Sequence, residues 1–439
     1  LLQHRVEFQP HLGVVAFHIN GIDRVEFSVD NGPWLPVREM TLNPRTDVVE
    51  YWVNLDATMF EDGPIEVRAV AYPTVGIPRV LGGEIDDSAE AEKGEHSIFL
   101  STNANRTLPE IAMYVATTGS DETGDGTETN PYRTMMKAAR AIQDASPSGN
   151  ADGGIIYLAP GEHRIGTYSY SFLTTTVNRW LTIQPRAGIN REDVEITGAD
   201  PDGLRTGLVC LRDLILRAET AEDQIMILGQ SDSSYWVNGC SFIGPGRAVN
   251  SRWTSLGGKL YLTECQVTEC RDAPGGALVR DLDIRLIGSD AFGGGGMAVN
   301  SSVSEIDPTG TEFHADVLQF YTNSGTIENR IAYGITAATA FGQGFFAGAD
   351  ISIKDIAFVD CDIDNQLAPN VARVFQFGGP TEHLYVLDCT FNGPANWRID
   401  FSFTAHNVVV ENSSFSSLPN PLDVEGVTYR PPLEKGIRR

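Results

Sequence analysis

Val386-Leu387-Asp388-Cys389-Thr390-Phe391 is one of five six-residue stretches that begin and end with an apolar residue and carry cysteine or serine in fourth place. The others are 237–242, 262–267, 358–363 and 410–415. The fourth residue recurs after 25 positions from Cys240 to Cys265, after 28 from Cys361 to Cys389 and after 24 from Cys389 to Ser413. Coils of roughly 20–30 residues bury a continuous core by stacking, so this period predicts a β-helix rather than unrelated strands of a sandwich.

The fourth and sixth residues of each stretch point to the same side of a strand, because side chains alternate between its two faces. We therefore expect Cys240, Cys265, Cys361, Cys389 and Ser413 to form a buried ladder. The chain has six cysteines in 439 residues and no CxxC spacing. These are too few for a disulfide scaffold and carry no zinc signature.

A helix is predicted to close the N-terminal end of the repeat region. Its apolar residues recur at i, i+3, i+4 and i+7, which is typical of an amphipathic helix: Met135, Ala138, Ala139 and Ile142. A strand at 114–116 and a loop rich in Gly, Asp and Thr at 119–130 precede it, and a strand that ends in the Pro160-Gly161 turn follows. This order predicts a cap helix that leads into the first coil.

The order of strand, G-x-G-x-x-x-N-P-Y-x-T (124–134), helix and I-Y-L-x-P-G (156–161) resembles the opening of secreted parallel β-helix proteins, pectate-lyase-like, which include many polysaccharide lyases. The resemblance implies an all-β fold, a right-handed parallel β-helix with an N-terminal cap helix over residues 107–439. It also implies a secreted or cell-surface location and polysaccharide as the partner.

Residues 1–106 are predicted to form a separate, small β-sandwich. Alternating apolar residues at 25–29, followed by Asp30-Asn31-Gly32, predict a strand and a hairpin turn, and 65–70 predicts a further strand. The stretch 48–63 resembles bacterial immunoglobulin-like modules. An acidic loop is expected before a last strand at 96–100.

The chain carries a formal net charge of −26, from 58 Asp and Glu against 32 Lys and Arg. Such a charge repels nucleic acid and anionic membranes, so neither is expected as a partner. No stretch approaches the roughly 20 apolar residues of a membrane span, and the first residues lack a signal-peptide core. We therefore expect a mature chain without membrane insertion, and self-association stays open.

A second ladder carries the predicted substrate-binding residues. Gln319, Gln343, Gln376 and Asp400 follow one another after 24, 33 and 24 positions. In register they line one face together with nearby aromatic residues: Phe320, Tyr321, Phe346 and Trp397. Amides bind sugar hydroxyls and rings cover the apolar faces of pyranoses, so the ladder predicts a polysaccharide groove. An inward polar ladder with the phenylalanines in the core is the alternative.

His314 and Asp316 are the predicted catalytic pair. On an extended strand both project to one side, where the carboxylate can orient the imidazole as a general acid or base. The segment H-A-D-x-x-Q resembles one in β-helix proteins linked to polysaccharide processing. Arg373, with Arg398 near the same face, can neutralise a substrate carboxylate, as a lyase acting on a uronate polymer requires. A structural His–Asp pair and solvated arginines are the alternatives.

Asp360, Asp362 and Asp364 alternate along one predicted strand and so share a face. Carboxylates about 6.6–7 Å apart can favour calcium, although they lack the compact loop of an EF-hand. A plain acidic outer face is the preferred interpretation. No cofactor is therefore predicted, with calcium as the alternative.

These expectations combine into a carbohydrate-active β-helix protein, with a lyase that cleaves a uronate-containing polymer as the leading hypothesis. A glycoside hydrolase needs two carboxylates about 5–9.5 Å apart. The nearest candidates, Asp316 and Asp400, lie about three coils apart, roughly 14 Å. A non-catalytic surface, adhesin or filament protein is the third hypothesis, and it predicts a groove without an acid–base pair.

Overall fold

The chain divides into two compact units between residues 110 and 111. The boundary predicted from the sequence lies at residues 106 and 107. The computed structural model describes residues 11–80, 83–84, 97–102, 104–105, 107, 111–145, 154–164, 181–197, 208–221, 224–227, 234–250, 259–271, 278–293, 297–307, 315–320, 325–338, 343–348, 351–364, 373–393, 398–401, 405–415 and 426–430.

The N-terminal unit contains two small antiparallel sheets and a short 3-10 helix, η1 (Ala57–Met59). One sheet has the order β1-β5-β4, with strands His11–Val14, Val48–Asn54 and Thr41–Asn43. The other has the order β3-β2-β6-β7-β8, with β9 also paired to β6; its strands are β2 (Ile22–Val29), β3 (Leu35–Val37), β6 (Gly63–Pro73), β7 (Arg79–Val80), β8 (Gly83–Glu84) and β9 (Ser97–Thr102). The sheets confirm the β character of this region, and the immunoglobulin-like sandwich stays a prediction.

The first hairpin of this unit follows from its alternating pattern. Val25, Phe27 and Val29 of β2 are all buried, as the period of two predicted. Asp30 and Asn31 take left-handed φ values of 48° and 56° in the turn to β3. Asp and Asn tolerate this backbone better than most residues. The predicted strands at 65–70 and 96–100 correspond to β6 and β9, and most of the acidic loop lies outside the described residues.

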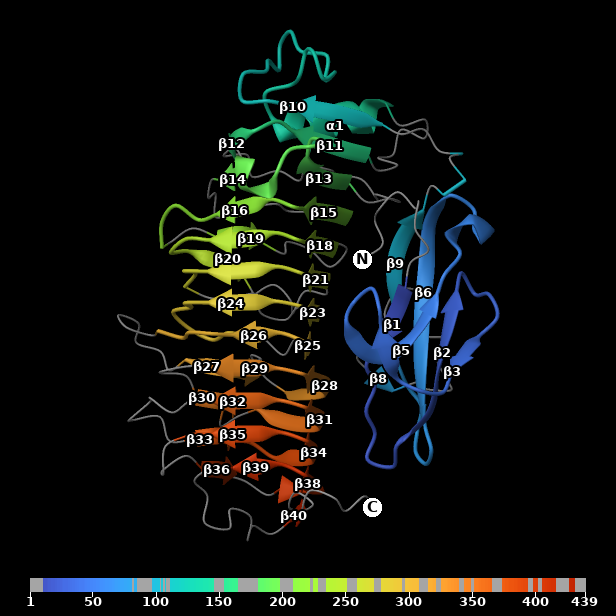
Figure 1. Cartoon of the computed structure of the whole chain (residues 1–439), viewed down its shortest axis with the longest axis vertical. Coiled ribbons are helices and arrows are strands. Elements are labelled where there is room, and N and C mark those ends of the chain that lie inside the picture. The colour runs from blue at the N-terminus through green and yellow to red at the C-terminus, as the bar shows by residue number, and fades with distance from the viewer. Residues whose placement is uncertain are drawn as a thin grey trace. The chain divides into compact units, whose positions relative to one another are not determined.

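The C-terminal unit is a parallel β-helix whose strands stack along one axis from β10 to β40 (Figure 1). The long sheet has 14 strands: β10 (Ala112–Val115), β11 (Gly154–Leu158), β13 (Leu181–Pro185), β15 (Leu208–Arg212), β18 (Ser234–Asn238), β21 (Lys259–Thr263), β23 (Leu278–Arg280), β25 (Met297–Val299), β28 (Thr326–Tyr333), β31 (Ser352–Val359), β34 (Thr381–Leu387), β37 (Ala405–His406), β38 (Val408–Glu411) and β40 (Val427–Arg430). All its pairs are parallel, which confirms the predicted β-helix.

Two further sheets complete the coils. The second sheet has 11 strands: β12 (Gly161–Arg164), β14 (Val194–Thr197), β16 (Ile215–Arg217), β19 (Ser241–Ile243), β22 (Gln266–Thr268), β24 (Asp283–Arg285), β26 (Ser302–Val303), β29 (Thr336–Ala338), β32 (Asp362–Asp364), β35 (Thr390–Asn392) and β39 (Ser414–Phe415). The third sheet has four: β27 (Asp316–Phe320), β30 (Gln343–Ala347), β33 (Arg373–Phe377) and β36 (Arg398–Phe401). A short pair, β17 (Gln224–Ile227) and β20 (Arg247–Asn250), and the 3-10 helix η2 (Arg191–Asp193) lie in earlier coils.

The helix α1 (Met135–Ala145) is the predicted cap. Its buried residues are those of the predicted stripe: Met135, Ala138, Ala139 and Ile142. The Thr134 hydroxyl accepts a hydrogen bond from the Lys137 N–H (3.2 Å), the usual way to satisfy a free amide at a helix N-terminus. The apolar stripe joins the same core as the strands of the first coils.

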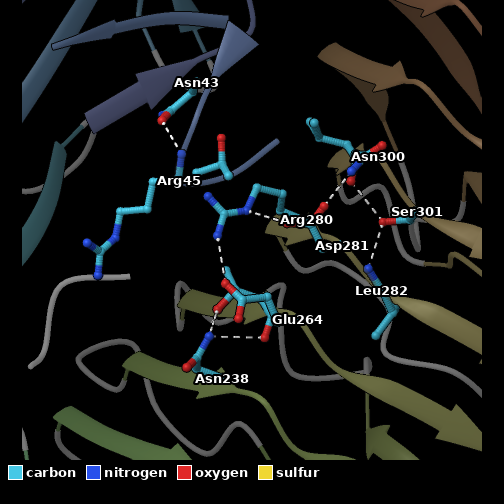
Figure 2. A network of polar contacts seen from close by, with 12 residues as sticks. Asn43, Arg45, Asn238, Glu264, Arg280, Asp281, Leu282, Asn300 and Ser301 are labelled. Atoms are coloured by element: carbon cyan, nitrogen blue, oxygen red, sulfur yellow. Dashed lines mark hydrogen bonds and ion pairs between the residues drawn. The ribbon is translucent and has the colours of Figure 1, made fainter. Parts of the chain in front are cut away.

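The turn from the long sheet to the second sheet repeats in nine coils. One residue with φ between 47° and 64° makes the turn: Asp213, Gly239, Glu264, Asp281, Asn300, Gly334, Asp360, Asp388 and Asn412. The residue after it is buried: Leu214, Cys240, Cys265, Leu282, Ser301, Ile335, Cys361, Cys389 and Ser413. Figure 2 shows two polar contacts of these turns, Asn300 Nδ2 donating to Asp281 Oδ1 (2.6 Å) and Arg280 beside Glu264.

The predicted buried ladder of four cysteines and Ser413 is confirmed, but its place in the coil is corrected. Cys389 lies in the corner between β34 and β35 rather than inside a strand. The left-handed residue before it, Asp388, bends the chain at this point. A single bend of this kind directs the next side chain inward. The predicted burial is therefore correct, whereas the strand ends before the corner and is shorter than predicted.

Gly334 offers a test of the left-handed turn. Gly334→Val should lower the free energy of unfolding by about 1–3 kcal/mol, because a β-branched residue is strained at φ +64°. Gly334→Asn should cost less than about 1 kcal/mol, because asparagine occupies the equivalent place at Asn300 and Asn412. A Cβ at residue 334 would meet only Asn300, at 3.7 Å. Denaturant titration of both variants measures the difference, and equal losses would contradict backbone strain as the cause.

Candidate functional site

The third sheet carries the predicted binding residues. Its register places Gln319 beside Phe346, Phe346 beside Gln376, and Gln376 beside Asp400. Neighbouring strands lie about 4.8 Å apart, so these four positions form one column, which we call the amide column. Gln319 and Phe346 are half-buried, whereas the residues that flank them belong to the core: Leu318, Phe320, Phe345 and Ala347. Phe320, expected beside the groove, is therefore a core residue.

Gln343 is not part of the amide column, which corrects the predicted ladder. It pairs with Asp316, and Phe346 takes its place beside Gln319. The reason is the length of this coil, because 27 residues rather than 24 separate paired positions. The column therefore reads Gln, Phe, Gln, Asp in register.

The predicted catalytic pair is only partly described. Asp316 begins β27 and is fully buried, at 0% exposure, and its N–H donates to Asp290 Oδ1 at 3.0 Å. In this position its carboxylate does not face solvent. His314, Tyr321 and Trp397 lie outside the described residues. For the remaining predicted residues the structure describes the strand but not the side chain: Arg373, Gln376, Arg398 and Asp400.

The predicted acidic face is divided between a turn and a strand. Asp360 makes the left-handed turn after β31, whereas Asp362 and Asp364 lie on β32. Cys361 and Ile363 are buried between them, as expected. In the described part of the chain no three His, Cys, Asp or Glu side chains gather as a metal site. Among the same residues, no helix has the length and apolar character needed to cross a membrane.

A second column, of left-handed residues, runs through the long sheet. Asn329, Asp355, His383 and Asn407 have φ values between 53° and 55°. They occupy one position in four successive coils, because the residues just before them pair in the order Glu328, Lys354, Glu382, His406. Asn, Asp and His are the non-glycine residues most often found with this backbone. The column therefore places four polar side chains one above another.

Asp355 and His383 form the central pair of this column. His383 Nδ1 lies 2.9 Å from Asp355 Oδ1. The His383 side chain is 32% exposed and that of Asp355 is 19% exposed. When Nδ1–H donates to the carboxylate, the free electron pair of the ring is on Nε2, which lies 3.7 Å from Glu382 Oε1. The pair is thus a carboxylate-oriented imidazole that solvent reaches.

Tyr385 adds a proton donor beside this pair. It follows His383 by two residues and pairs with Ala357 and Val409 on the long sheet. Burial raises the pKa of the Tyr385 hydroxyl, and the negative charge of Asp355 raises it further. The phenol therefore keeps its proton well above neutral pH. An imidazole nitrogen can accept a proton and a protonated phenol can donate one, so His383 and Tyr385 can move protons in opposite directions on one substrate.

The Asp355–His383 pair was not predicted from the sequence, although a signal for it was present. Each member of the column stands six residues before the buried corner residue of its coil, as Asp355 stands before Cys361 and His383 before Cys389. The 28-residue spacing of those cysteines therefore also separates Asp355 from His383. The same 28-residue spacing, applied to the polar residues upstream of the cysteines, predicts that Asp355 and His383 are neighbours in adjacent coils.

No family model and no curated protein matches this sequence. Solved structures that align with this chain include the A-module of the mannuronan C-5 epimerase AlgE4 of Azotobacter vinelandii, at 15% identity and a TM-score of 0.34, covering 72% of this chain and 91% of that one. The family 28 exopolygalacturonase of Yersinia enterocolitica has 11% identity, a TM-score of 0.34 and 98% coverage of both chains. Dex49A from Penicillium minioluteum has 10% identity and a TM-score of 0.39, covering 95% and 91%. At these values the likenesses assign no activity.

Proposed function

We propose that this chain is a secreted or cell-surface polysaccharide lyase that cleaves a uronate-containing polymer by β-elimination. The observation that carries the proposal is the 2.9 Å hydrogen bond between His383 Nδ1 and Asp355 Oδ1, with Tyr385 beside it on the long sheet. An elimination needs one group to remove a proton and another to supply one. An oriented imidazole and a protonated phenol meet that need.

In the proposed reaction His383 Nε2 takes the C5 proton of a uronate unit. The electrons of that C–H bond form the C4=C5 double bond, the C4–O4 bond breaks, and the Tyr385 hydroxyl gives its proton to O4. Asp355 stabilises the imidazolium that forms and holds the ring in place. The cycle closes when the proton on His383 returns to Tyr385.

The amide column offers a surface for polymer binding in the same coils as this pair. Gln376 of the column and His383 stand seven residues apart in the same coil, on β33 and β34. The column repeats about every 4.8 Å along the β-helix, so a chain of sugars can lie across several coils. Amides supply hydrogen bonds to hydroxyls and the Phe346 ring supplies an apolar surface.

A panel of polymers tests the proposal and its two alternatives. Uronate polymers (polygalacturonate, alginate and hyaluronan) and neutral polymers such as dextran are incubated with the full chain. Ultraviolet absorbance of new unsaturated ends, together with reducing sugar, indicates a lyase. Reducing sugar without that absorbance would replace it with a glycoside hydrolase. Binding without either product would favour a non-catalytic surface, adhesin or filament protein.

Tyr385→Phe should lower the kcat of the elimination by about 10²-fold, the low end of what a positioned proton donor contributes. The raised pKa of Tyr385 also sets the sign of the pH dependence. The acid is active while protonated, so kcat falls as pH rises through that raised pKa, above the usual value of about 10. The pH–rate profiles of both proteins measure this. A wild-type alkaline limb that survives in Tyr385→Phe would remove Tyr385 from the reaction.

A further inference from the structure

A lysine stands next to the acid–base pair in the sequence and on the long sheet. Lys354 precedes Asp355 on β31 and is half-buried. Its register places it between Glu328 of the previous coil and Glu382 of the next. Within the part of the chain that the structure describes, its ammonium group makes no hydrogen bond or ion pair.

The neighbouring carboxylates are engaged elsewhere or point to solvent. Glu382 Oε1 lies 3.7 Å from His383 Nε2, and among the described residues no ion pair joins Glu382 to Lys354. Glu328 is exposed. Neighbouring strands lie about 4.8 Å apart, so either glutamate is close enough in register to pair with Lys354, yet neither does so among the described residues. The ammonium group therefore remains available to an anion from outside.

We propose that Lys354 binds the carboxylate of the uronate unit whose C5 proton His383 removes, and so selects carboxylated over neutral sugars. The inference rests on the proposed lyase function and names the residue that reads the substrate's charge. A uronate carboxylate is one bond from C5, and Lys354 lies one coil from His383, so the two contacts match one sugar unit. An ammonium on that carboxylate also draws electrons from C5 and makes its proton more acidic.

The charge around the pair explains why one cation is required. Glu328, Asp355 and Glu382 surround Lys354, and the whole chain carries a net charge of −26. Without the lysine these carboxylates repel a polyanion. Arg373, the cation predicted from the sequence, lies on the third sheet, so its substitution tests a different contact with the polymer.

Binding of the full chain to polygalacturonate and alginate, and to the same polymers after reduction of their carboxyl groups to alcohols, tests the inference. Lys354→Gln should raise the Kd for the better uronate polymer at least about tenfold and leave the Kd for its reduced form unchanged. Lys354→Arg should stay within about threefold of the wild type. Lys137→Gln, which removes the same charge on α1, should change neither Kd.

The outcomes separate the inference from the function it rests on. Equal Kd values for Lys354→Gln and wild type on the uronate polymer, or equal weakening on both forms, would overturn the role of Lys354 while unsaturated products still supported a lyase. Selective weakening without any product in the wild type would support Lys354 as the carboxylate contact and overturn the lyase. Failure of the wild type to bind either uronate polymer would overturn the inference.

Discussion

His383→Asn is expected to reduce turnover of the uronate polymer by about 10²–10⁴-fold, the usual contribution of a positioned proton-transfer group. Asparagine is the replacement of choice because Asn329 and Asn407 occupy the same left-handed position in neighbouring coils. It preserves the backbone and removes the base. The melting temperature should therefore stay close to that of the wild type, so loss of activity reports on the chemistry.

Three further variants make the result specific. Asp355→Asn keeps a left-handed residue but removes the charge that stabilises the imidazolium, so it should lower kcat with little change in Kd. Asn407→Ala changes the same column without removing a proton-transfer group, and its turnover should match the wild type. His314→Ala tests the pair predicted from the sequence. Full activity in His383→Asn together with loss in His314→Ala would make His314 the base in place of His383.

The parts of the fold that could be predicted from the sequence are those in which one chemical property recurs. The stripe of α1 and the cysteine ladder both repeat an apolar or small residue at a fixed interval, and burial follows directly from that repetition. The interval also indicates parallel stacking, because stacked coils of about 24–28 residues place equivalent residues side by side in one core.

The register of the amide column could not be predicted in the same way. Polar residues on an outer face do not have to match in order to fold, so their spacing follows the lengths of the loops between strands. Gln319 and Gln343 are 24 residues apart by coincidence, whereas the residue that pairs with Gln319 is Phe346. Loops on the outside of a coil vary in length with little cost, and each extra residue shifts the next outer side chain.

His383 was missed for a different reason. Its partner Asp355 stands 28 residues away in the sequence and becomes its neighbour only through stacking. His314 and Asp316 satisfied a local rule, two residues apart on a strand. Asp316 is instead buried, because Leu318 and Phe320, which alternate with it on β27, carry that side of the strand into the core.

Cys265→Asp is expected to lower the free energy of unfolding by several kcal/mol at neutral pH, because it places an unpaired carboxylate in the core. Cys265 is 1% exposed, and its thiol donates only weakly to the carbonyl oxygens of Thr263 and Val237, at 3.3 and 3.4 Å. Burial already raises the pKa of this thiol to about 12. The same burial acts against any other anion at this place.

The matched control is Cys265→Ser, because the ladder already holds a serine. Ser413 Oγ donates to the Glu411 carbonyl oxygen at 2.9 Å and accepts from the Cys389 N–H at 3.1 Å. A serine at residue 265 has equivalent backbone groups within reach, so it should cost about 1 kcal/mol or less. Both variants keep a small polar side chain, and they differ in whether it can ionise.

The pH dependence distinguishes a buried charge from simple loss of packing. The pKa of an aspartate at residue 265 would be raised in the folded state above its unfolded value of about 3.9. Between those two values the folded protein holds a proton that the unfolded chain has lost, so stability falls by about 1.4 kcal/mol for each pH unit of rise. The cost of Cys265→Asp relative to Cys265→Ser should therefore shrink as pH falls from 7 toward 4. Denaturant titrations at several pH values measure it, and a cost that does not change with pH would show that the introduced side chain escapes to solvent.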